Sequence, residues 1–184
     1  SRDELKTIGQ RFTKIRKGEP LTFDRFQKKL KKVANSKLLS RIFDNMCSGS
    51  GFGGEREVLP DQTCTYEQWV RAIAMSCKCS EDYQVQALLN LVMKEGQKGI
   101  DREHFTSLLT LVSQSAREKI HVELLWDTLP QRELTSEDYV AQIKAIRDNV
   151  WSTNNAGSKL SFSSIKSFFC INRQFLAYLD YIWR

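Results

Sequence analysis

Leu21-Thr-Phe-Asp-Arg-Phe26 is the first of five short stretches that repeat one pattern along this 184-residue chain. Each stretch, which we call a hexad, has an apolar residue first, a Thr, Ser or Asp second, and an aromatic residue or Ile at its end. The polar residue can cap a helix by accepting a hydrogen bond from a free amide of its first turn. Because a regular repeat fixes the architecture, the hexads predict helix–loop–helix units. The other four are Cys64-Thr-Tyr-Glu-Gln-Trp69, Ile100-Asp-Arg-Glu-His-Phe105, Leu134-Thr-Ser-Glu-Asp-Tyr139 and Leu160-Ser-Phe-Ser-Ser-Ile165.

The segments between the hexads have the periodicity of amphipathic helices. Residues 3–15, for example, place Leu5, Ile8, Phe12 and Ile15 on one face at spacings of three or four. Similar patterns predict further helices, and the sequence as a whole is that of an all-α protein. The predicted helices cover about 23–32, 36–46, 66–77, 83–93, 120–128 and 139–148, and an aromatic-rich segment closes the chain.

The hexads resemble the ends of EF-hand loops, and the resemblance covers most of the chain. In that superfamily the apolar residue at the eighth loop position pairs with its counterpart in a neighbouring loop. The resemblance therefore implies paired EF-hand-like units with very short β-bridges between their loops. It implies a first pair over residues 1–79, with a glycine-rich insertion at 47–61. A second pair follows over 80–184, together with a partial fifth unit and an aromatic C-terminal helix.

Composition narrows the class of protein. An apolar share of 41% with only 3 prolines is typical of an ordered globular chain. No stretch approaches the roughly 20 apolar residues that span a bilayer. Five irregularly spaced cysteines favour free thiols in the reducing cytoplasm over a disulfide framework. The net charge of +6 permits an acidic partner or an anionic membrane surface without requiring one.

The loops lack the ligands that calcium needs. Calcium takes six to eight oxygens, and an EF-hand loop supplies two of them from a Glu at its twelfth position. Here that position holds Arg25, Gln68, His104 and Ser164, and only the fourth loop keeps a carboxylate there, in Asp138. We therefore expect no metal site and no cofactor. A genuine calcium sensor remains the alternative, with the loops at 93–104 and 127–138 as its candidates.

No constellation of residues is typical of catalysis. His104 and His121 fall in different units, and neither accompanies a Cys or Ser motif. Gly49-Ser-Gly-Phe-Gly-Gly54 lacks the Gly-Lys-Ser/Thr that completes a phosphate-binding loop. We therefore expect a protein that is not an enzyme and has no catalytic residues.

The densest basic patch follows the first hexad. Lys28, Lys29, Lys31 and Lys32 form either a solvated helix face or a surface that attracts anionic lipid or an acidic partner. Nucleic acid is disfavoured as a partner, because no stacking aromatics alternate with these lysines.

The aromatic tail suggests a second surface. Paired EF-hands typically expose an apolar groove that takes an amphipathic helix. The tail could fill this groove within the chain, or leave it and act as a regulatory segment. The tail stripe consists of Phe168, Phe169, Ile171, Phe175, Leu176, Leu179, Ile182 and Trp183. We predict partner or groove contacts at Trp69, Phe105, Tyr139, Phe168, Phe169, Phe175, Tyr178 and Trp183.

The layout is similar to one particular group of proteins. Degenerate loops, the glycine-rich insertion and the closing segment Ile165-Lys-Ser-Phe-Phe-Cys-Ile-Asn-Arg-Gln-Phe-Leu176 resemble the N-terminal module of TLDc-domain proteins, the type linked to mTOR signalling at lysosomes. This resemblance implies a regulatory module of a larger protein that docks at the lysosomal membrane on the V-ATPase. A TLDc domain would follow as a further partner within the same chain. A similar closing pattern occurs in the N-terminus of a ubiquitin-specific protease, so a regulatory domain of a deubiquitinase is also open.

Overall fold

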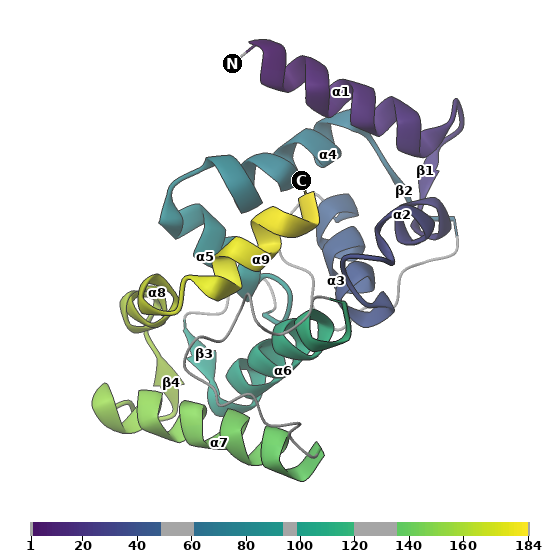
Figure 1. The fold of residues 1–184 in the computed structure, drawn as a ribbon. Coiled ribbons are helices and arrows are strands. Elements are labelled where there is room, and N and C mark those ends of the chain that lie inside the picture. Colours follow the sequence, from purple (N-terminus) through teal and green to yellow (C-terminus); the bar gives the residue numbers. More distant parts are fainter. Residues whose placement is uncertain (1, 49–60, 94–98, 120–135, 184) are drawn as a thin grey trace.

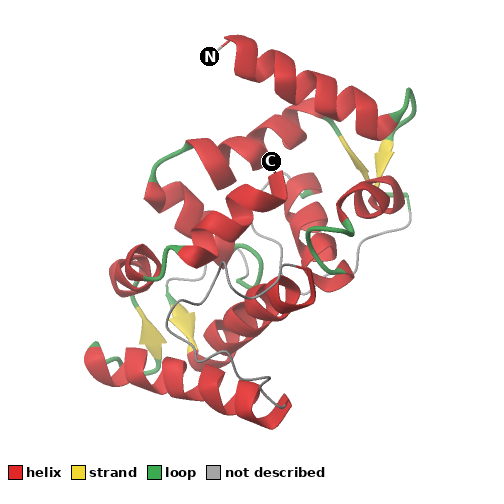
Figure 2. Cartoon of the chain, in the orientation of Figure 1, coloured by secondary structure: helices red, strands yellow, loops and turns green. Residues whose placement is uncertain are grey.

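Helices make up most of the computed structural model, which describes residues 2–48, 61–93, 99–119 and 136–183 (Figures 1 and 2). Within these residues the only strands are two antiparallel pairs of two residues each. The predicted all-α class is therefore confirmed, as are the very short strand pairs. None of the described helices is both long enough and apolar enough to cross a membrane.

The first half of the chain contains two helix–strand–helix units. The strands β1 and β2 pair antiparallel, with Leu21 opposite Cys64, so the first hexad pairs with the second. Helix α2 ends two residues before the predicted position. The elements are α1 (Arg2–Arg16), β1 (Leu21–Thr22), α2 (Phe23–Leu30), α3 (Ser36–Cys47), β2 (Thr63–Cys64) and α4 (Tyr66–Ile73).

The second half pairs the third hexad with the fifth. Ile100 lies opposite Leu160. The fifth unit was expected to be only partial, and its strand pairing with the third hexad was not predicted. Residues 134–135, which begin the fourth hexad, and the helix predicted at 120–128 lie outside the described residues. The π-helical turn η1 (Ala74–Lys78) continues α4 at the end of the first half. The elements of the second half are α5 (Glu81–Leu89), β3 (Ile100–Asp101), α6 (Arg102–Lys119), α7 (Ser136–Thr153), β4 (Lys159–Leu160), α8 (Phe162–Ile171) and α9 (Gln174–Trp183).

A glycine permits the β3–β4 pair. Gly99 precedes β3 with a φ of +83°, a conformation that residues with a Cβ rarely adopt. A Cβ built on Gly99 would lie 2.4 Å from the carbonyl oxygen of Leu160. The two strands approach each other closely because this position has no side chain.

Four hexads have a second residue that the structure describes, and in three of them this residue caps the helix that follows. Thr65 accepts from the amide of Gln68, and Gln68 completes a capping box. Ser161 accepts from the amide of Ser164, and Asp101 from that of His104. Thr22 makes no such bond, so the predicted cap is wrong at α2. Side-chain bonds from Arg25 organise this loop instead, as described below.

A continuous apolar core joins the two halves. The predicted boundary near 79–82 falls between η1 and α5, but buried residues of both halves form one cluster. Figure 1 shows α9, the last helix, beside elements of the first half and far from α7. The tail stripe is broken, because α8 ends at Ile171 and the next residue, Asn172, has a non-helical ψ of 61°. Ile171, predicted on the buried stripe, is consequently 83% exposed.

Candidate functional site

Arg25 occupies the twelfth position of the first loop and binds the loop itself. Its Nη1 donates to the carbonyl of Arg16 at 2.7 Å, and its Nη2 pairs with the carboxylate of Glu19. These acceptors stand at the third and sixth loop positions. The guanidinium therefore places a positive charge between a carbonyl and a carboxylate of its own loop.

Gln68, at the twelfth position of the second loop, also bonds the backbone of its own loop. Its Nε2 donates to the carbonyl of Cys47 at 2.8 Å, and its Oε1 accepts from the amide of Thr65 at 2.8 Å. In a calcium loop this position offers two acceptor oxygens to the ion. Here the one side-chain oxygen of Gln68 accepts the bond that completes the helix cap, and the donor Nε2 stands in place of a second oxygen.

The twelfth-position residues of the third and fifth loops also bond within the chain. The ring Nδ1 of His104 lies 2.8 Å from Asp101 Oδ1, and the hydroxyls of Ser161 and Ser164 are 3.0 Å apart. Burial acts to raise the pKa of Asp101, but hydrogen bonds from His104 outweigh it and hold that pKa below its ordinary value. Within the described ranges no three His, Cys, Asp or Glu residues gather as metal ligands would. Residues 94–98 and 127–135 of the candidate calcium loops lie outside those ranges.

The tail helix α9 fills an aromatic pocket in the first half. The Trp183 ring packs edge-on against Trp69 at 5.3 Å between centroids, and lies 6.1 Å from Phe26. Phe12 and Phe43 complete this set, which we call the Trp183 cluster. The tail helix is thus docked on the rest of the chain through Trp183. The Nε1 atoms of Trp69 and Trp183 are buried, and neither has a hydrogen-bond partner among the described residues.

Most of the other predicted contact residues form a second cluster. Trp151 was not among the predicted contacts, although a large aromatic near the end of an amphipathic helix is a signal of core packing. The Phe105 cluster consists of Phe105, Trp151, Phe168, Phe169 and Phe175. Tyr139 lies apart, with its hydroxyl 2.8 Å from Ser113 Oγ and its ring under Arg117 at 5.0 Å. All eight predicted residues are buried or partly buried within the chain, and their use by a partner stays a prediction.

Tyr178 joins the tail to both halves of the molecule. Its hydroxyl donates to the carbonyl of Val33 at 2.9 Å and lies 2.8 Å from Ser115 Oγ, which also accepts from the amide of Asn35 at 2.9 Å. Burial raises the pKa of Tyr178 to about 12, despite the hydrogen bond to Ser115. Sequence reasoning missed Ser115. A polar residue on the apolar face of α6 was the available signal.

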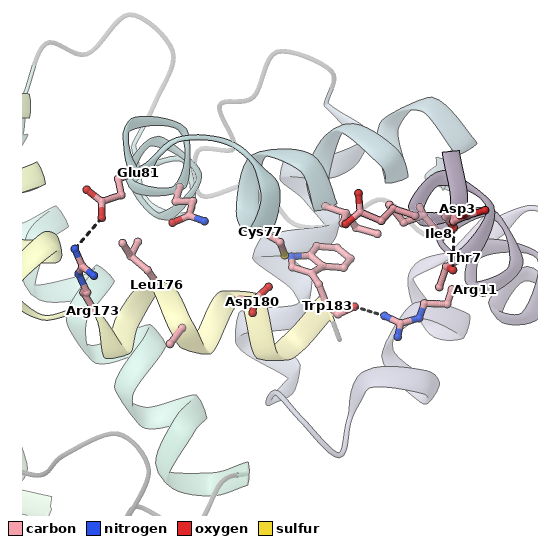
Figure 3. A pocket seen from close by; sticks show the side chains of 14 residues that line it. Asp3, Thr7, Ile8, Arg11, Cys77, Glu81, Arg173, Leu176, Asp180 and Trp183 are labelled. Atoms are coloured by element: carbon pink, nitrogen blue, oxygen red, sulfur yellow. Dashed lines mark hydrogen bonds and ion pairs between the residues drawn. The ribbon is translucent and has the colours of Figure 1, made fainter. Parts of the chain in front are cut away.

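An open cleft of about 780 Å³ runs between α1, η1 with α5, and α9 (Figure 3). At one end Arg11 Nη1 donates to the carbonyl of Trp183 at 2.7 Å, and at the other Arg173 pairs with Glu81 at 3.2 Å. Both arginines are thus bonded within the chain. The cleft borders the tail helix, and the bonds at its two ends connect that helix to α1 and α5.

The basic patch remains at the surface. Lys28, Lys29, Lys31 and Lys32 are all exposed, at and just beyond the C-terminal end of α2. Cations at this end of a helix interact favourably with its dipole. The patch therefore has a structural role in addition to any role in binding.

The histidines form no catalytic arrangement within the described chain. His104 bonds to the capping carboxylate of Asp101, and His121 lies outside the described residues. No protein-family model matches this sequence, and a search of curated proteins finds no match either.

Proposed function

We propose that this chain is a non-catalytic, calcium-independent protein-interaction and regulatory module built on an EF-hand-like frame. The twelfth-position side chains of the first two loops carry the proposal. Arg25 and Gln68 donate to backbone carbonyls near the start of their own loops. A calcium loop needs acceptors there, and a guanidinium also repels a divalent ion. What these loops retain is the strand pair and the helix start.

Calorimetric titration with calcium tests this proposal. We expect no binding at micromolar calcium and no change in tryptophan fluorescence against a chelator blank. Fluorescence is a sensitive second measurement, because the Trp69–Trp183 contact at 5.3 Å reports any movement of the tail. Micromolar binding accompanied by a fluorescence change would make the chain a calcium sensor and refute the proposal.

The basic patch is the surface that we propose for docking on an acidic partner. Its four lysines are exposed on one short segment, and Coulomb attraction to clustered negative charge adds up over such a set. An anionic membrane attracts each nearby lysine by about 1 kcal/mol, so a liposome is a suitable first probe.

Charge reversal with a matched control measures this contribution. Changing Lys28, Lys29 and Lys32 to Glu is expected to weaken binding to anionic liposomes in a sedimentation assay. The control reverses three exposed lysines elsewhere on the chain and so changes the net charge equally: Lys6, Lys144 and Lys159. Equal losses in both variants would reduce the patch to a solvated helix face.

The TLDc resemblance supports a location for this docking. What it implies is a module of a larger protein at the lysosomal membrane, with the V-ATPase as partner and a TLDc domain in the same chain. Affinity capture of V-ATPase subunits by the intact parent protein, with and without residues 168–184, tests this. Unchanged capture by the shortened protein would remove the tail from the interaction, and failure of the intact protein to capture the subunits would refute the partner.

A further inference from the structure

The open cleft beside the tail helix is large and is bounded by helices. It has a volume of about 780 Å³, and the Arg173–Glu81 and Arg11–Trp183 bonds mark its two ends (Figure 3). The interval from Arg173 to Trp183 corresponds to about 15 Å at 1.5 Å per residue. About two turns of a helix roughly 10 Å wide occupy the same volume. A short helix therefore fits the cleft in both length and volume.

The side chains that line the cleft recur at helical spacing. Asp3, Thr7 and Arg11 line it from α1, each four residues after the last. Asp180 and Trp183 line it from α9, three residues apart. Rows of side chains at these spacings pack against the matching rows of another helix. None of the described residues that line the cleft belongs to a strand, so the cleft offers no strand edge to an extended segment.

The cleft also has an apolar lining, to which Ile8, Ile73 and Leu176 contribute. Ile8 is half-buried, whereas Leu5, three residues earlier on the same face of α1, is 52% exposed. Figure 1 shows the N-terminal end of α1 standing away from the other helices. The apolar face of α1 is therefore covered toward its C-terminal end and uncovered at its start, beside the cleft.

The charge of the cleft is opposite in sign to that of the chain. The whole chain has 28 basic and 22 acidic residues. The lining of the cleft has four carboxylates and only two guanidiniums, and the guanidinium of Arg173 is already paired with Glu81. Cationic side chains are therefore attracted to the cleft, although the protein as a whole is basic. The six charged residues are Asp3, Glu4, Glu81, Asp180, Arg11 and Arg173.

We infer that this cleft docks a basic amphipathic helix of a partner protein. The apolar side chains of that helix pack on Ile8 and Leu176, and its Lys or Arg side chains lie toward Asp3 and Glu4. Because α9 is itself a wall of the cleft, the partner adds to the docked tail and does not replace it. The inference rests on the proposed function as an interaction module, but it concerns a surface of opposite charge to the basic patch.

A synthetic helical peptide of about 14 residues, with leucines on one face and lysines on the other, is the probe. Fluorescence anisotropy of the labelled peptide with the full chain should show saturable binding that weakens as salt is raised. A matched peptide with Glu in place of each Lys should bind at least about tenfold more weakly. Absence of saturable binding by the lysine peptide, or equal binding of the two peptides, would overturn the inference.

Charge reversal has a closely matched control. The double variant Asp3→Lys, Glu4→Lys should weaken binding of the lysine peptide by about tenfold or more. The control, Glu137→Lys with Asp138→Lys, changes the net charge equally and also removes two carboxylates from the first turn of a helix. That helix, α7, lies far from the cleft (Figure 1), so the control should bind like the wild type. Equal losses would mean that the peptide responds only to net charge, and the inference would be wrong.

A steric variant tests the cleft without changing its charge. Ala177 is exposed and lines the cleft, so Ala177→Tyr should abolish binding, whereas Ala145→Tyr on the exposed side of α7 should not. Retained binding by Ala177→Tyr would refute the inference. So would dimerisation of the wild type that Ala177→Tyr prevents, since a second copy would then occupy the cleft. The basic-patch variant with Lys28, Lys29 and Lys32 changed to Glu should still bind the lysine peptide, which separates failure of the patch from failure of the cleft.

Discussion

Replacing Gly99 with Ala should lower the free energy of unfolding more than any other glycine-to-alanine change in the described chain, through its effect on the second half of the molecule. Two effects act at this position. Its φ of +83° opposes a Cβ, which costs about 1–2 kcal/mol for an L-residue. In addition, the new Cβ would lie 2.4 Å from the carbonyl of Leu160, so β3 and β4 must separate.

The chain offers a control for each effect. Gly18 has the same φ of +83° with no atom within 4 Å of its Cβ position, so Gly18→Ala has the strain without the clash. Gly157→Ala has neither, and should change the free energy of unfolding by no more than about 0.5 kcal/mol. Strand separation adds the loss of hydrogen bonds worth about 1 kcal/mol each. We expect about 1 kcal/mol for Gly18→Ala and about 3 kcal/mol for Gly99→Ala.

Urea unfolding followed by circular dichroism measures all three variants. A loss at Gly99→Ala equal to that at Gly18→Ala would show that backbone strain is the whole effect. The pairing of Ile100 with Leu160 would then be wrong, because no carbonyl would lie close to the glycine.

Three further predictions concern single side chains. Tyr178→Phe should lower the free energy of unfolding by about 1–3 kcal/mol, because it removes the bonds to Val33 and Ser115. The control Tyr181→Phe, on the exposed side of α9, should have little effect. Urea unfolding distinguishes the two variants, and equal losses would argue against the hydrogen-bond network of Tyr178. The free energy of unfolding should fall as pH rises from about 10 to about 12, because the pKa of Tyr178 is about 12 in the folded chain and about 10 in the unfolded chain. Urea denaturation midpoints at about pH 9 and about pH 11 test this. The Tyr178→Phe variant should show a weaker fall. Thr65→Ala should cost about 1 kcal/mol of stability, because it removes the capping box of α4. Thr22→Ala breaks no cap and should cost less than about 0.5 kcal/mol. Thermal unfolding measures both, and a larger loss at Thr22→Ala than at Thr65→Ala would contradict the assigned caps.

The twelfth-position residues show how far local sequence can go. Counting along the loops was enough to predict that Arg25 and Gln68 disfavour calcium. It did not predict what these side chains bind, because the acceptors are carbonyls near the other end of each loop. Position along the chain identifies which group is present, and the folded loop determines its partner.

The pairing of the hexads shows a different limit. All five hexads have similar local signals, so the sequence offers no local reason for Ile100 to choose Leu160 as its partner. The choice depends on where α5, α6, α7 and α8 pack, which is set by contacts between residues distant in sequence. Ser115 escaped notice for the same reason, since its partners lie 80 and 63 residues away.

The sequence by itself determined that this protein is helical, where most of its helices lie and which loops lack calcium ligands. These properties follow from spacings of three or four residues and from the chemistry of single side chains, which act over one or two turns. The tertiary structure alone decided that the third hexad pairs with the fifth and that the tail occupies the aromatic pocket around Trp69. Each of these contacts joins distant segments, and burial of a shared core stabilises them only when the whole chain is folded.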